Sequence, residues 1–597
     1  MKRRRLFALG LAGLFLSVFF LYLKTCCSSP YPDDSPETAA VCALLGVGHP
    51  PGYPLHVLLG HLFSWLPLGD PGFSLNLFSC FLGALGACLA AGLAFFLASP
   101  PGVGAWDSPS FPAAWAGALL AGGLLALGPV YWGEALLAKG SVYLLDADFT
   151  LALLCVARAG GGAGAARLFW LLMGLALANH YMTQVLLLPA YLLLPWGREG
   201  KGRLPLAAAA WALPGLSLWA YLPLRAACHP AVNWGGIHSL AGWADYMARR
   251  QYLPMEVTRG LSGSLHVLAG CGRAVLLQAG ALGCLAGLGG LVLAWRRALP
   301  WRGFWLACLG LFSVVPALYL NLPGRAIELA RYYLFPAYLC AALLAGMFLA
   351  RVLERGRVRA WLAPLLAAGL LAQALALAPG LGRAGYYYGW DYGRNLMLGA
   401  PRGGLLFSES DAALFESWYF QNWRGLRPDL AVVPEPMLPG RWTRALLARR
   451  FPEILQPDVE VVGRDSRLPV LLGFLKLNLG RRFVAFSGPL ELPGYCMAPL
   501  GLLSLPWPGD RPPRLSDGGR RLENLWRAYC LRGLDRPSPD ETTGESIFQF
   551  YRRAEQAFGD LLAANHLPDA ARRHWRLAAR LGRESVPPPS PWWENIL

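Results

Sequence analysis

The sequence predicts an α-helical polytopic membrane protein with about eleven transmembrane helices and a C-terminal extracytoplasmic domain built from an α/β part and a helical part. Of its 597 residues, 55% are hydrophobic and only 15% are charged, whereas soluble proteins carry about a quarter charged residues. Long apolar runs recur as far as residue 383 and then stop. The net charge is +17, but basic residues gather in short segments between the runs. This pattern is typical of membrane topology and argues against a nucleic-acid partner.

The first apolar run, Leu6 to Leu23, follows a strongly basic segment and is long enough to span a bilayer. No small-residue cleavage site follows it, so we expect an uncleaved first helix. The apolar segment from His56 to Leu68 is too short to cross. The fifth and sixth of the eleven spans are separated by a predicted break within Asn179 to Gln184. After the first, the predicted spans are 74–98, 112–131, 142–157, 168–184, 185–197, 204–223, 267–295, 303–320, 332–350 and 359–379.

The distribution of Lys and Arg predicts an orientation. If the N-terminus lies inside, every second loop should be cytoplasmic and basic. These loops hold Arg158, Arg167, Arg198, Lys201, Arg203, Arg296, Arg297, Arg302, Arg351, Arg355, Arg357 and Arg359. The agreement predicts a cytoplasmic N-terminus and a C-terminal domain outside. A composition rich in Arg, Ala, Gly and Leu further suggests the inner (plasma) membrane of a bacterium.

The end of the long apolar runs divides the chain. Residues 1–383 form the predicted transmembrane domain, with a first outer loop at 24–73; residues 384–519 form the α/β domain and residues 520–597 the helical region. In the α/β domain, short apolar runs predict strands at Gly403–Phe407, Leu430–Val433, Pro469–Leu475 and Arg482–Phe486, with a helix at Asp411–Trp423 that Ser410 or Asp411 would cap.

In the helical region, the segments Ala554–Leu562 and Ala570–Leu581 form a predicted helix pair. One such pair is like a single tetratricopeptide unit, although solenoids usually need about three repeats. Because the grooves formed by tetratricopeptide repeats commonly bind extended peptides, we expect this region to help select a protein acceptor if there is one.

Polar residues gather on the predicted outer face of the membrane domain. They are Asp34, Glu37, His49, Glu134, Lys139, His180, Arg225, Arg325, Glu328 and Arg331. Ionisable groups near lipid are functional candidates because they are costly unless they are paired or solvated. Arg225, Arg325 and Arg331 lie where basic residues are not expected, which favours an anionic partner such as a phosphate. The alternative is that they extend toward water or pair with Glu328 and Glu134.

Two motifs in the first outer loop allow a structural and a catalytic interpretation. Asp34-Ser-Pro-Glu37 has the spacing of a helix cap, which could be the whole role of Glu37, yet a capped Asp34 is also held in one orientation as a general base. The turn from His49 through Tyr53 to Pro54 contains three prolines and Gly52, which would bend the loop back to the membrane or place His49 beside Asp34.

Asn233 and Trp234 lie in another predicted outer turn. Trp234 could stack on a sugar or could sit at the membrane interface, as tryptophans often do. The thirteen cysteines are scattered, many of them in apolar runs, and no CxxC pair occurs. We therefore expect no metal site, no disulfide framework and no cofactor.

The segment between residues 30 and 255 contains a series of distinctive sequence motifs. They are Asp34-Ser-Pro-Glu37, Gly48-His-Pro-Pro-Gly-Tyr-Pro-Leu55, Asn76-Leu-Phe-Ser79, Tyr131-Trp-Gly-Glu134, Gly174-Leu-Ala-Leu-Ala-Asn-His180, Tyr221-Leu-Pro-Leu-Arg-Ala226, Asn233-Trp-Gly235 and Arg249-Arg-Gln-Tyr252. With these motifs, the chain resembles the protein O-mannosyltransferase-like transmembrane family, long catalogued as a domain of unknown function. Arg427-Pro-Asp429 in the outer domain also fits, and the resemblance is looser toward the C-terminus.

The resemblance implies a glycosyltransferase with a GT-C fold that works on the outer face. Such an enzyme takes a hexose, here expected to be mannose, from a polyprenyl-phosphate donor and passes it to a hydroxyl, with inversion at the anomeric carbon. The acidic residue of the family's first outer loop corresponds to Asp34, with Glu37 as a second catalytic candidate. Arg225, assisted by Arg325, Arg331 or His180, would bind the donor phosphate. The expected partners are the bilayer, the lipid-linked sugar and a protein or lipid acceptor.

One position departs from the family pattern. An acidic residue commonly precedes Val-Tyr in the family, whereas this chain has Lys139 before Gly-Ser-Val-Tyr143. If that acid helps catalysis elsewhere, Glu134 or Glu37 would replace it here, or activity is altered. Two other classes therefore stay open: a transporter or flippase of lipid-linked sugars, which should have inverted repeats and broken helices at mid-membrane, and an inactive membrane scaffold.

Overall fold

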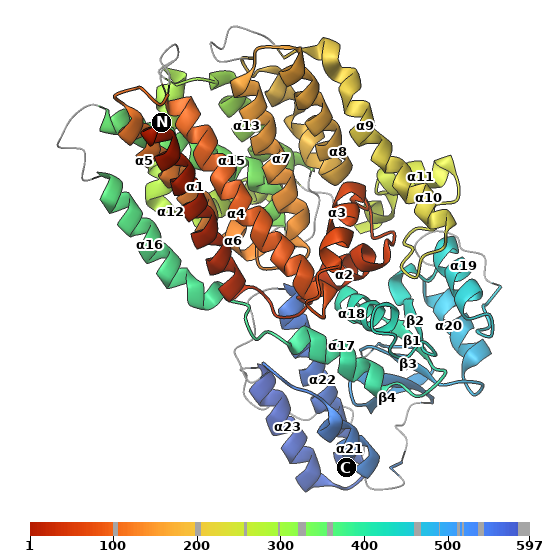
Figure 1. The fold of residues 1–597 in the computed structure, drawn as a ribbon. Helices are drawn as coiled ribbons and strands as arrows, with labels where there is room; N and C mark the ends of the chain where they lie inside the picture. The colour runs from red at the N-terminus through yellow and green to blue at the C-terminus, as the bar shows by residue number, and fades with distance from the viewer. Residues whose placement is uncertain are drawn as a thin grey trace.

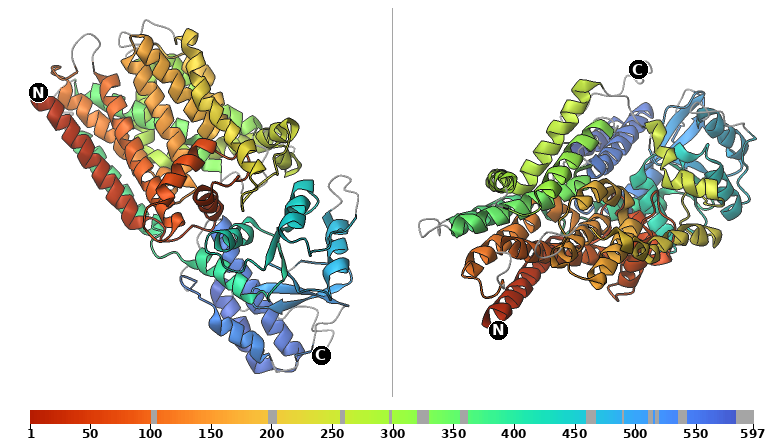
Figure 2. Two further views of the ribbon diagram at one scale, coloured as in Figure 1. Left: turned by 45° about the vertical axis from the view of Figure 1, so that its right-hand side comes forward. Right: turned by 90° about the horizontal axis from the view of Figure 1, so that it is seen from above.

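The computed structural model describes residues 1–582, except residues 100–104, 197–203, 256–259, 297–298, 320–329, 355–361, 459–466, 489, 510–513, 516–518 and 535–541. A bundle of long helices forms one body, and a smaller domain with a sheet lies against one of its ends (Figure 1). The first residues of α1 (Lys2–Thr25) lie at the end of the bundle that is distant from this smaller domain (Figure 2).

Within the described residues, eight helical segments are long and apolar enough to cross a membrane, and two shorter apolar helices accompany them. The eight are α1, α4 (Pro71–Ala98), α7 (Gly140–Ala159), α8 (Ala163–Leu192), the segment Leu206–Ala227 that ends in α10 (Tyr221–Ala227), α12 (Leu261–Trp295), the segment Arg331–Leu353 that contains α15 (Phe335–Leu353), and Pro364–Leu381 in α16 (Leu362–Leu381). The shorter two are α5 (Phe111–Ala126) and α13 (Arg302–Tyr319). The expected helical polytopic membrane fold is therefore confirmed.

Helix α8 consists of two helical segments that meet at His180 and fold back on each other. His180 has non-helical dihedral angles (φ −141°, ψ 80°). The rings of Phe169 and Tyr191 approach to 6.1 Å, whereas a straight helix would hold the two residues about 33 Å apart. The break predicted within Asn179 to Gln184 is thus confirmed, and the described residues hold eight segments of spanning length against the eleven predicted.

Helix α12 departs from the prediction of one continuous span from 267 to 295. It breaks at Gly280, whose φ of +66° is readily adopted only by glycine. The Sγ of Cys284 lies 3.8 Å from the carbonyl oxygen of Val275, which a straight helix would not allow. Gly290 then packs against the backbone of Leu344 in α15.

Short elements connect the spans at the end of the bundle that faces the smaller domain. They are α2 (Ser35–Leu44), α3 (Pro54–Ser64), α6 (Pro129–Glu134), α11 (Leu240–Met247), η3 (Arg250–Met255) and η4 (Ala330–Leu334). Helices α2 and α3 belong to the first outer loop, and α3 is too short to cross a bilayer, as predicted.

The smaller domain is built on a five-stranded mixed sheet with the order β2-β1-β3-β5-β4. Its strands are β1 (Leu405–Ser408), β2 (Ala431–Pro434), β3 (Val484–Phe486), β4 (Tyr495–Leu500) and β5 (Leu503–Pro508). Strand β1 runs parallel to β2 and β3, with Leu406 opposite Val432 and Ala485. The other helical elements are α17 (Tyr388–Gly399), α18 (Asp411–Asn422), η6 (Glu435–Met437), α19 (Arg441–Arg450), α20 (Arg467–Asn478), α21 (Arg520–Ala528), α22 (Thr542–Ala564) and α23 (Pro568–Gly582).

The predicted strand at Pro469–Leu475 is wrong, because this segment is helix α20. A short apolar run does not distinguish a buried strand from a buried helix. Pro469 lies in the first helical turn, where proline is tolerated. The predicted helix over 411–423 is confirmed as α18, and the hydroxyl of Ser410 caps it by accepting a hydrogen bond from the N–H of Ala413.

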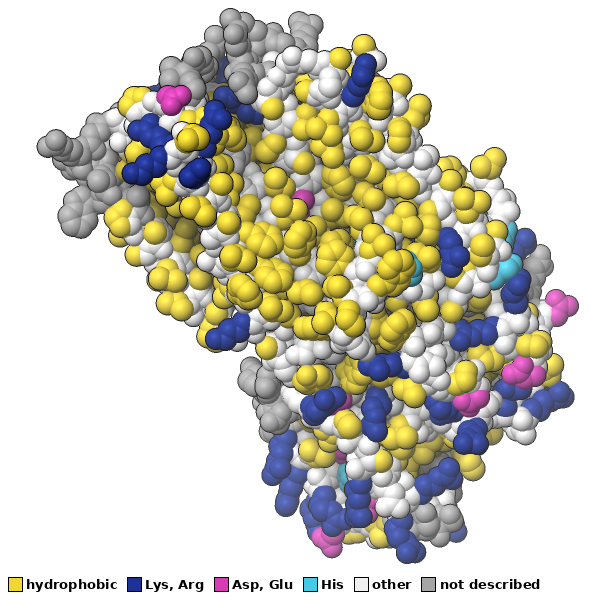
Figure 3. All heavy atoms as spheres, in the orientation of Figure 1, with side chains coloured by type: hydrophobic (Ala, Val, Ile, Leu, Met, Phe, Trp, Pro, Cys, Tyr) yellow, Lys and Arg dark blue, Asp and Glu magenta, His cyan; other side chains and the backbone are white. Residues whose placement is uncertain are grey.

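The smaller domain contacts the first outer loop directly. The hydroxyl of Tyr419 in α18 donates to Oδ1 of Asp70 over 2.8 Å, and Arg424 lies 3.3 Å from Oδ2 of the same residue. The first loop and the C-terminal domain therefore occupy the same face of the bundle. Arg3 instead donates to the carbonyl of Ser108 at the other end. The surface separates in the same way, with apolar side chains over much of the bundle and basic side chains over the smaller domain (Figure 3).

Candidate active site

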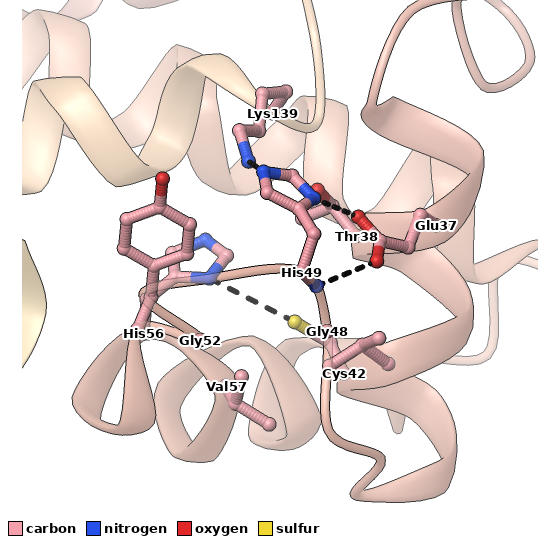
Figure 4. Close-up of a pocket in the computed structure, with 11 residues that line it drawn as sticks. Glu37, Thr38, Cys42, Gly48, His49, Gly52, His56, Val57 and Lys139 are labelled. Carbon is pink, nitrogen blue, oxygen red and sulfur yellow. Dashed lines mark hydrogen bonds and ion pairs between the residues drawn. The ribbon is translucent and has the colours of Figure 1, made fainter. Parts of the chain in front are cut away.

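Four charged or titratable side chains come together where the first outer loop contacts the residue that precedes α7. Nζ of Lys139 lies 3.4 Å from Oδ2 of Asp34 and 3.3 Å from Nε2 of His49. The same imidazole nitrogen lies 3.6 Å from Asp34, while Nδ1 of His49 contacts Oε2 of Glu37. Figure 4 shows Lys139, His49 and Glu37 in line above a small pocket. Asp34, Glu37, His49 and Lys139 are called the acid–base cluster below.

The acid–base cluster excludes the interpretation of Asp34-Ser-Pro-Glu37 as a capping box alone. Asp34 precedes α2, but its side chain makes no capping hydrogen bond; instead Oδ1 of Asp33 accepts from the N–H of Ser35 over 2.6 Å. Glu37 is 98% buried and accepts the N–H of His49 over 2.8 Å. Glu37 therefore orients His49, and Asp34 keeps a carboxylate that is 36% exposed.

The backbone that carries His49 is held in place by the next outer segment. Arg225 donates to the carbonyl of Leu45 over 2.7 Å, Tyr221 donates to that of Gly46 over 2.8 Å, and Tyr246 donates to that of Gly48. These bonds fix residues 45–48 before the turn that begins at His49. Gly52 has a φ of +84°, and a Cβ there would lie 2.7 Å from the Tyr246 hydroxyl, so both conformation and space require glycine.

Opposite charges set the protonation of the acid–base cluster. Although loss of water favours the neutral acid, Lys139 and His49 outweigh this effect and lower the pKa of Asp34. At Asp33, burial and the charge on Asp34 outweigh the hydrogen bonds from Ser35 and the charge on Lys139, and they raise its pKa to about 6. At neutral pH Asp34 is therefore ionised, as a general base must be before it accepts a proton.

A second group of side chains adjoins the acid–base cluster through Tyr53. Nζ of Lys139 lies 4.6 Å from the centre of the Tyr53 ring, which stacks on His180 at 5.8 Å. Nδ1 of His180 pairs with the hydroxyl of Thr183 over 2.7 Å, while its buried Nε2 has no hydrogen-bond partner in the part of the chain that the structure describes. An imidazole nitrogen held in this way is available to a polar ligand.

Arg249 is a site residue that the sequence analysis did not single out. Its guanidinium lies 4.8 Å from the centre of the Tyr252 ring, and its charge lowers the pKa of Asp34. Its buried Nε lacks a hydrogen-bond partner among the described residues. The only sequence signal was its place in the Arg249-Arg-Gln-Tyr252 motif, which gave no indication that the chain folds back to Tyr53.

Of the three predicted phosphate-binding arginines, the two that the structure describes do not lie at the acid–base cluster. The guanidinium of Arg225 is bonded to carbonyls at the end of α2, which is a structural role. Arg331 is exposed at the start of η4, and its carbonyl accepts from Tyr338 over 2.9 Å. Arg325 lies outside the described residues. Among the described candidates for phosphate binding, His180 is the one that lies next to Tyr53.

The remaining candidates lie around the acid–base cluster. Glu134 ends α6 near Asp33, and burial followed by the charge on Asp33 raises its pKa to about 8. Asn233 is buried and donates to the carbonyl of Ala226 over 3.2 Å, so it supports the loop. The ring of Trp234 lies 6.2 Å from that of His49 and is itself buried, which places it beside the cluster but not at a membrane surface.

The fold and the acid–base cluster define a multi-pass membrane protein with a compact polar site on the face that carries its C-terminal domain. Residues 34–201, which include the whole cluster, match the family model described as the N-terminal domain of the protein O-mannosyl-transferase TMEM260. The resemblance to the protein O-mannosyltransferase-like family that the sequence analysis stated is confirmed by this match.

Known proteins similar to the chain extend the comparison. It is 21% identical to the protein O-mannosyl-transferase tmem260 of Dictyostelium discoideum, over 74% of this chain and 59% of that protein. It is 25% identical to the protein O-mannosyl-transferase TMEM260 of Mus musculus, over 75% of this chain and 65% of that protein. The chain thus spans about six tenths of the length of these relatives. A crystal structure of the oligosaccharyltransferase of Archaeoglobus fulgidus aligns with 70% of this chain and 62% of its own, at 12% identity and a TM-score of 0.37.

Proposed function

We propose that the protein is an integral membrane glycosyltransferase of the GT-C type that transfers a hexose, mannose in our expectation, from a polyprenyl-phosphate donor to a hydroxyl group. The observation that carries this proposal is the ionised, partly exposed Asp34 held between Lys139 and His49. Both curated relatives carry the name protein O-mannosyl-transferase, which favours a serine or threonine of a protein as the acceptor.

In the proposed reaction, Asp34 accepts the proton of the acceptor hydroxyl as that oxygen attacks the anomeric carbon. The bond between the anomeric carbon and the phosphate oxygen breaks on the opposite side, so the configuration inverts and the lipid phosphate leaves. Lys139 keeps Asp34 ionised in the free enzyme, and Glu37 holds the His49 ring in place. General-base catalysis of this kind contributes about 10²–10⁴-fold to the rate.

Arg249 and His180 would bind the leaving phosphate. Both present a buried nitrogen without a hydrogen-bond partner in the described residues, and both lie around Tyr53, which also contacts Lys139. A guanidinium and a neutral imidazole suit phosphate oxygens, and their fixed placement stabilises the charge that develops there. We propose this pair in place of Arg225, whose guanidinium is occupied by backbone carbonyls. With Arg249 supplying the positive charge at the phosphate, transfer should proceed in the presence of EDTA.

We further propose that this face is extracytoplasmic and that the chain resides in a bacterial inner membrane. The basic loops at the opposite end of the bundle support the orientation through the positive-inside rule. Cysteine labelling of intact cells at exposed positions of the C-terminal domain tests it. Modification by a membrane-impermeant maleimide supports the orientation, and modification only after lysis contradicts it.

The decisive experiment is sugar transfer by the purified protein in detergent. Radiolabelled polyprenyl-phosphate mannose is supplied with total envelope protein and lipid, and Asp34→Asn is assayed in parallel with Asp429→Asn as a matched control in the outer domain. We expect label in protein with the wild type and the control, and a loss of about 10²–10⁴-fold with Asp34→Asn at normal protein levels. Equal transfer by Asp34→Asn would contradict the assignment of the base. No transfer by the folded wild type would favour the transporter or scaffold classes.

A further inference from the structure

Helix α18 of the C-terminal domain packs its first turns onto the acid–base cluster. The ring of Phe415 lies 6.3 Å from that of His49, and the two planes are inclined by only 16°. Asp411 lies four residues earlier and therefore on the same face of the helix. Asp411 is close enough to Asp34, His49 and Glu37 for the charges of these residues to affect the pKa of its carboxyl group. The site thus has two walls, one from the membrane domain and one from the C-terminal domain.

The opening between these walls is accessible at two carboxylates. Asp411 is exposed and the Asp34 side chain is 36% exposed, whereas Phe415 and Trp418 on α18 are buried. A molecule that approaches Asp34 from the aqueous side therefore meets Asp411 as well. Because both groups are anionic and accept hydrogen bonds only, this opening disfavours an anionic acceptor and suits one that brings N–H or ammonium donors.

The fold gives Asp411 no evident structural role. The cap of α18 is the hydroxyl of Ser410, and Asp411 has no ion pair or side-chain hydrogen bond among the contacts of the described residues. An acidic residue in the first turn of a helix contributes only about 0.3–1 kcal/mol through the helix dipole. Loss of water, followed by the charge on Asp34, raises the pKa of Asp411 to about 6, so the carboxylate without a ligand is in an unfavourable environment.

We propose that Asp411 is an acceptor-binding residue that accepts hydrogen bonds from the backbone N–H groups or a lysine of a polypeptide segment, and so holds a serine or threonine hydroxyl against Asp34. This inference rests on the proposed glycosyltransferase function and deepens it. It assigns the acceptor side of the reaction to the C-terminal domain and the donor side to the residues around Tyr53. A polypeptide fits because its backbone presents an N–H donor at every residue other than proline, whatever side chains it carries.

The test uses the full-length protein in detergent with polyprenyl-phosphate mannose and a randomised library of short peptides, each with one threonine. Two products are measured, mannosylated peptide and free mannose from donor hydrolysis. Asp411→Asn should raise the KM for the peptides about tenfold or more, because hydrogen bonds to a charged group are the stronger kind. It should change the rate of donor hydrolysis far less than the peptide KM, and Asp411→Glu should restore part of the affinity.

Peptide charge and a matched variant separate binding from a structural effect. In the wild type, lysine beside the threonine should lower KM and glutamate should raise it, and Asp411→Asn should lose this difference. Glu453→Gln, at a carboxylate of the α/β domain that is 53% exposed, should behave as wild type. Equal KM and equal charge preference in wild type and Asp411→Asn would overturn the assignment of Asp411 alone. A wild type that hydrolyses donor but modifies no peptide would overturn the polypeptide acceptor, and one that turns over no donor would overturn the proposed function itself.

Discussion

The membrane domain and the C-terminal domain use charged residues in different ways. In the C-terminal domain, charges form separate pairs, such as Arg532 with Asp391 at 2.6 Å and Arg427 with Asp429 at 2.9 Å. In the acid–base cluster, His49 contacts two carboxylates and Lys139 at once. A separate pair neutralises itself and stabilises a local structure. A shared cluster leaves one member, Asp34, ionised and accessible, which is what a reaction requires.

The largest effect is expected when the positive charge of Lys139 is removed from the acid–base cluster. Lys139→Met should lower the free energy of unfolding by about 3–5 kcal/mol, because it leaves Asp34 and Glu37 without their buried cation. The exposed pair of Arg572 and Asp569 provides the contrast, and Arg572→Met should cost about 0–1 kcal/mol. Denaturant unfolding of both variants in detergent gives the two values. A cost below that of Arg572→Met would contradict the view of Lys139 as the centre of the cluster.

The acid–base cluster was only partly predictable from the sequence. The spacing of Asp34, Glu37 and His49 placed all three in one loop, and the turn at His49 predicted that the loop bends back. The contact of Lys139 with Asp34 depends on how α7 packs against this loop, which local spacing does not encode. Arg225 was predicted to bind phosphate because it lies on the outer side, yet the orphan carbonyls at the end of α2 occupy it.

A second prediction tests whether the residues around Tyr53 bind the donor and not the peptide acceptor. Arg249→Lys should weaken donor binding about tenfold, or about 1.4 kcal/mol, because an ammonium group cannot reproduce the planar, bidentate contact of a guanidinium with phosphate. Peptide KM should not change. Arg225→Lys is the matched control, and we expect it to affect stability and leave donor affinity at the wild-type value. Competition by polyprenyl phosphate in the transfer assay measures both affinities, and a larger loss of donor affinity in Arg225→Lys would reverse the assignment.

The fold of the C-terminal domain illustrates where sequence patterns fail. The buried parallel strands β1 and β2 were predictable as short apolar runs between turn residues. Strands β4 and β5 were missed because their side chains are mostly only half-buried and include Pro499, Pro506 and Pro508, which argue against strands. Strand β4 is an edge of the sheet, where proline is tolerated, whereas β5 lies between β3 and β4.

A third prediction concerns Glu134, whose raised pKa makes stability depend on pH. Its pKa is about 8 in the folded protein against an ordinary value of 4.5, so the folded state holds the proton more tightly. Stability is therefore full below pH 4.5 and falls as the pH rises from there to about 8. Glu134→Gln should be more stable than wild type at pH 8, by about 2–4 °C in Tm, with the difference vanishing near pH 4.5. A difference that does not change with pH would show that the carboxyl group does not titrate in this window.

The smallest expected change in stability concerns the contact between the two domains at Asp70. Asp70 of the first loop accepts a hydrogen bond from the Tyr419 hydroxyl of α18 and pairs with Arg424, which follows that helix, but the arginine side chain is 39% exposed. Arg424→Gln should therefore cost only about 0.2–1 kcal/mol, as exposed ion pairs do. Tyr419→Phe removes the better-shielded hydrogen bond and should cost about 0.5–1.5 kcal/mol. If acceptor binding needs the two walls of the site to stay together, Tyr419→Phe should also raise the peptide KM more than Arg424→Gln does. The opposite order in the peptide assay would show that the contact at Asp70 does not govern how α18 faces the acid–base cluster.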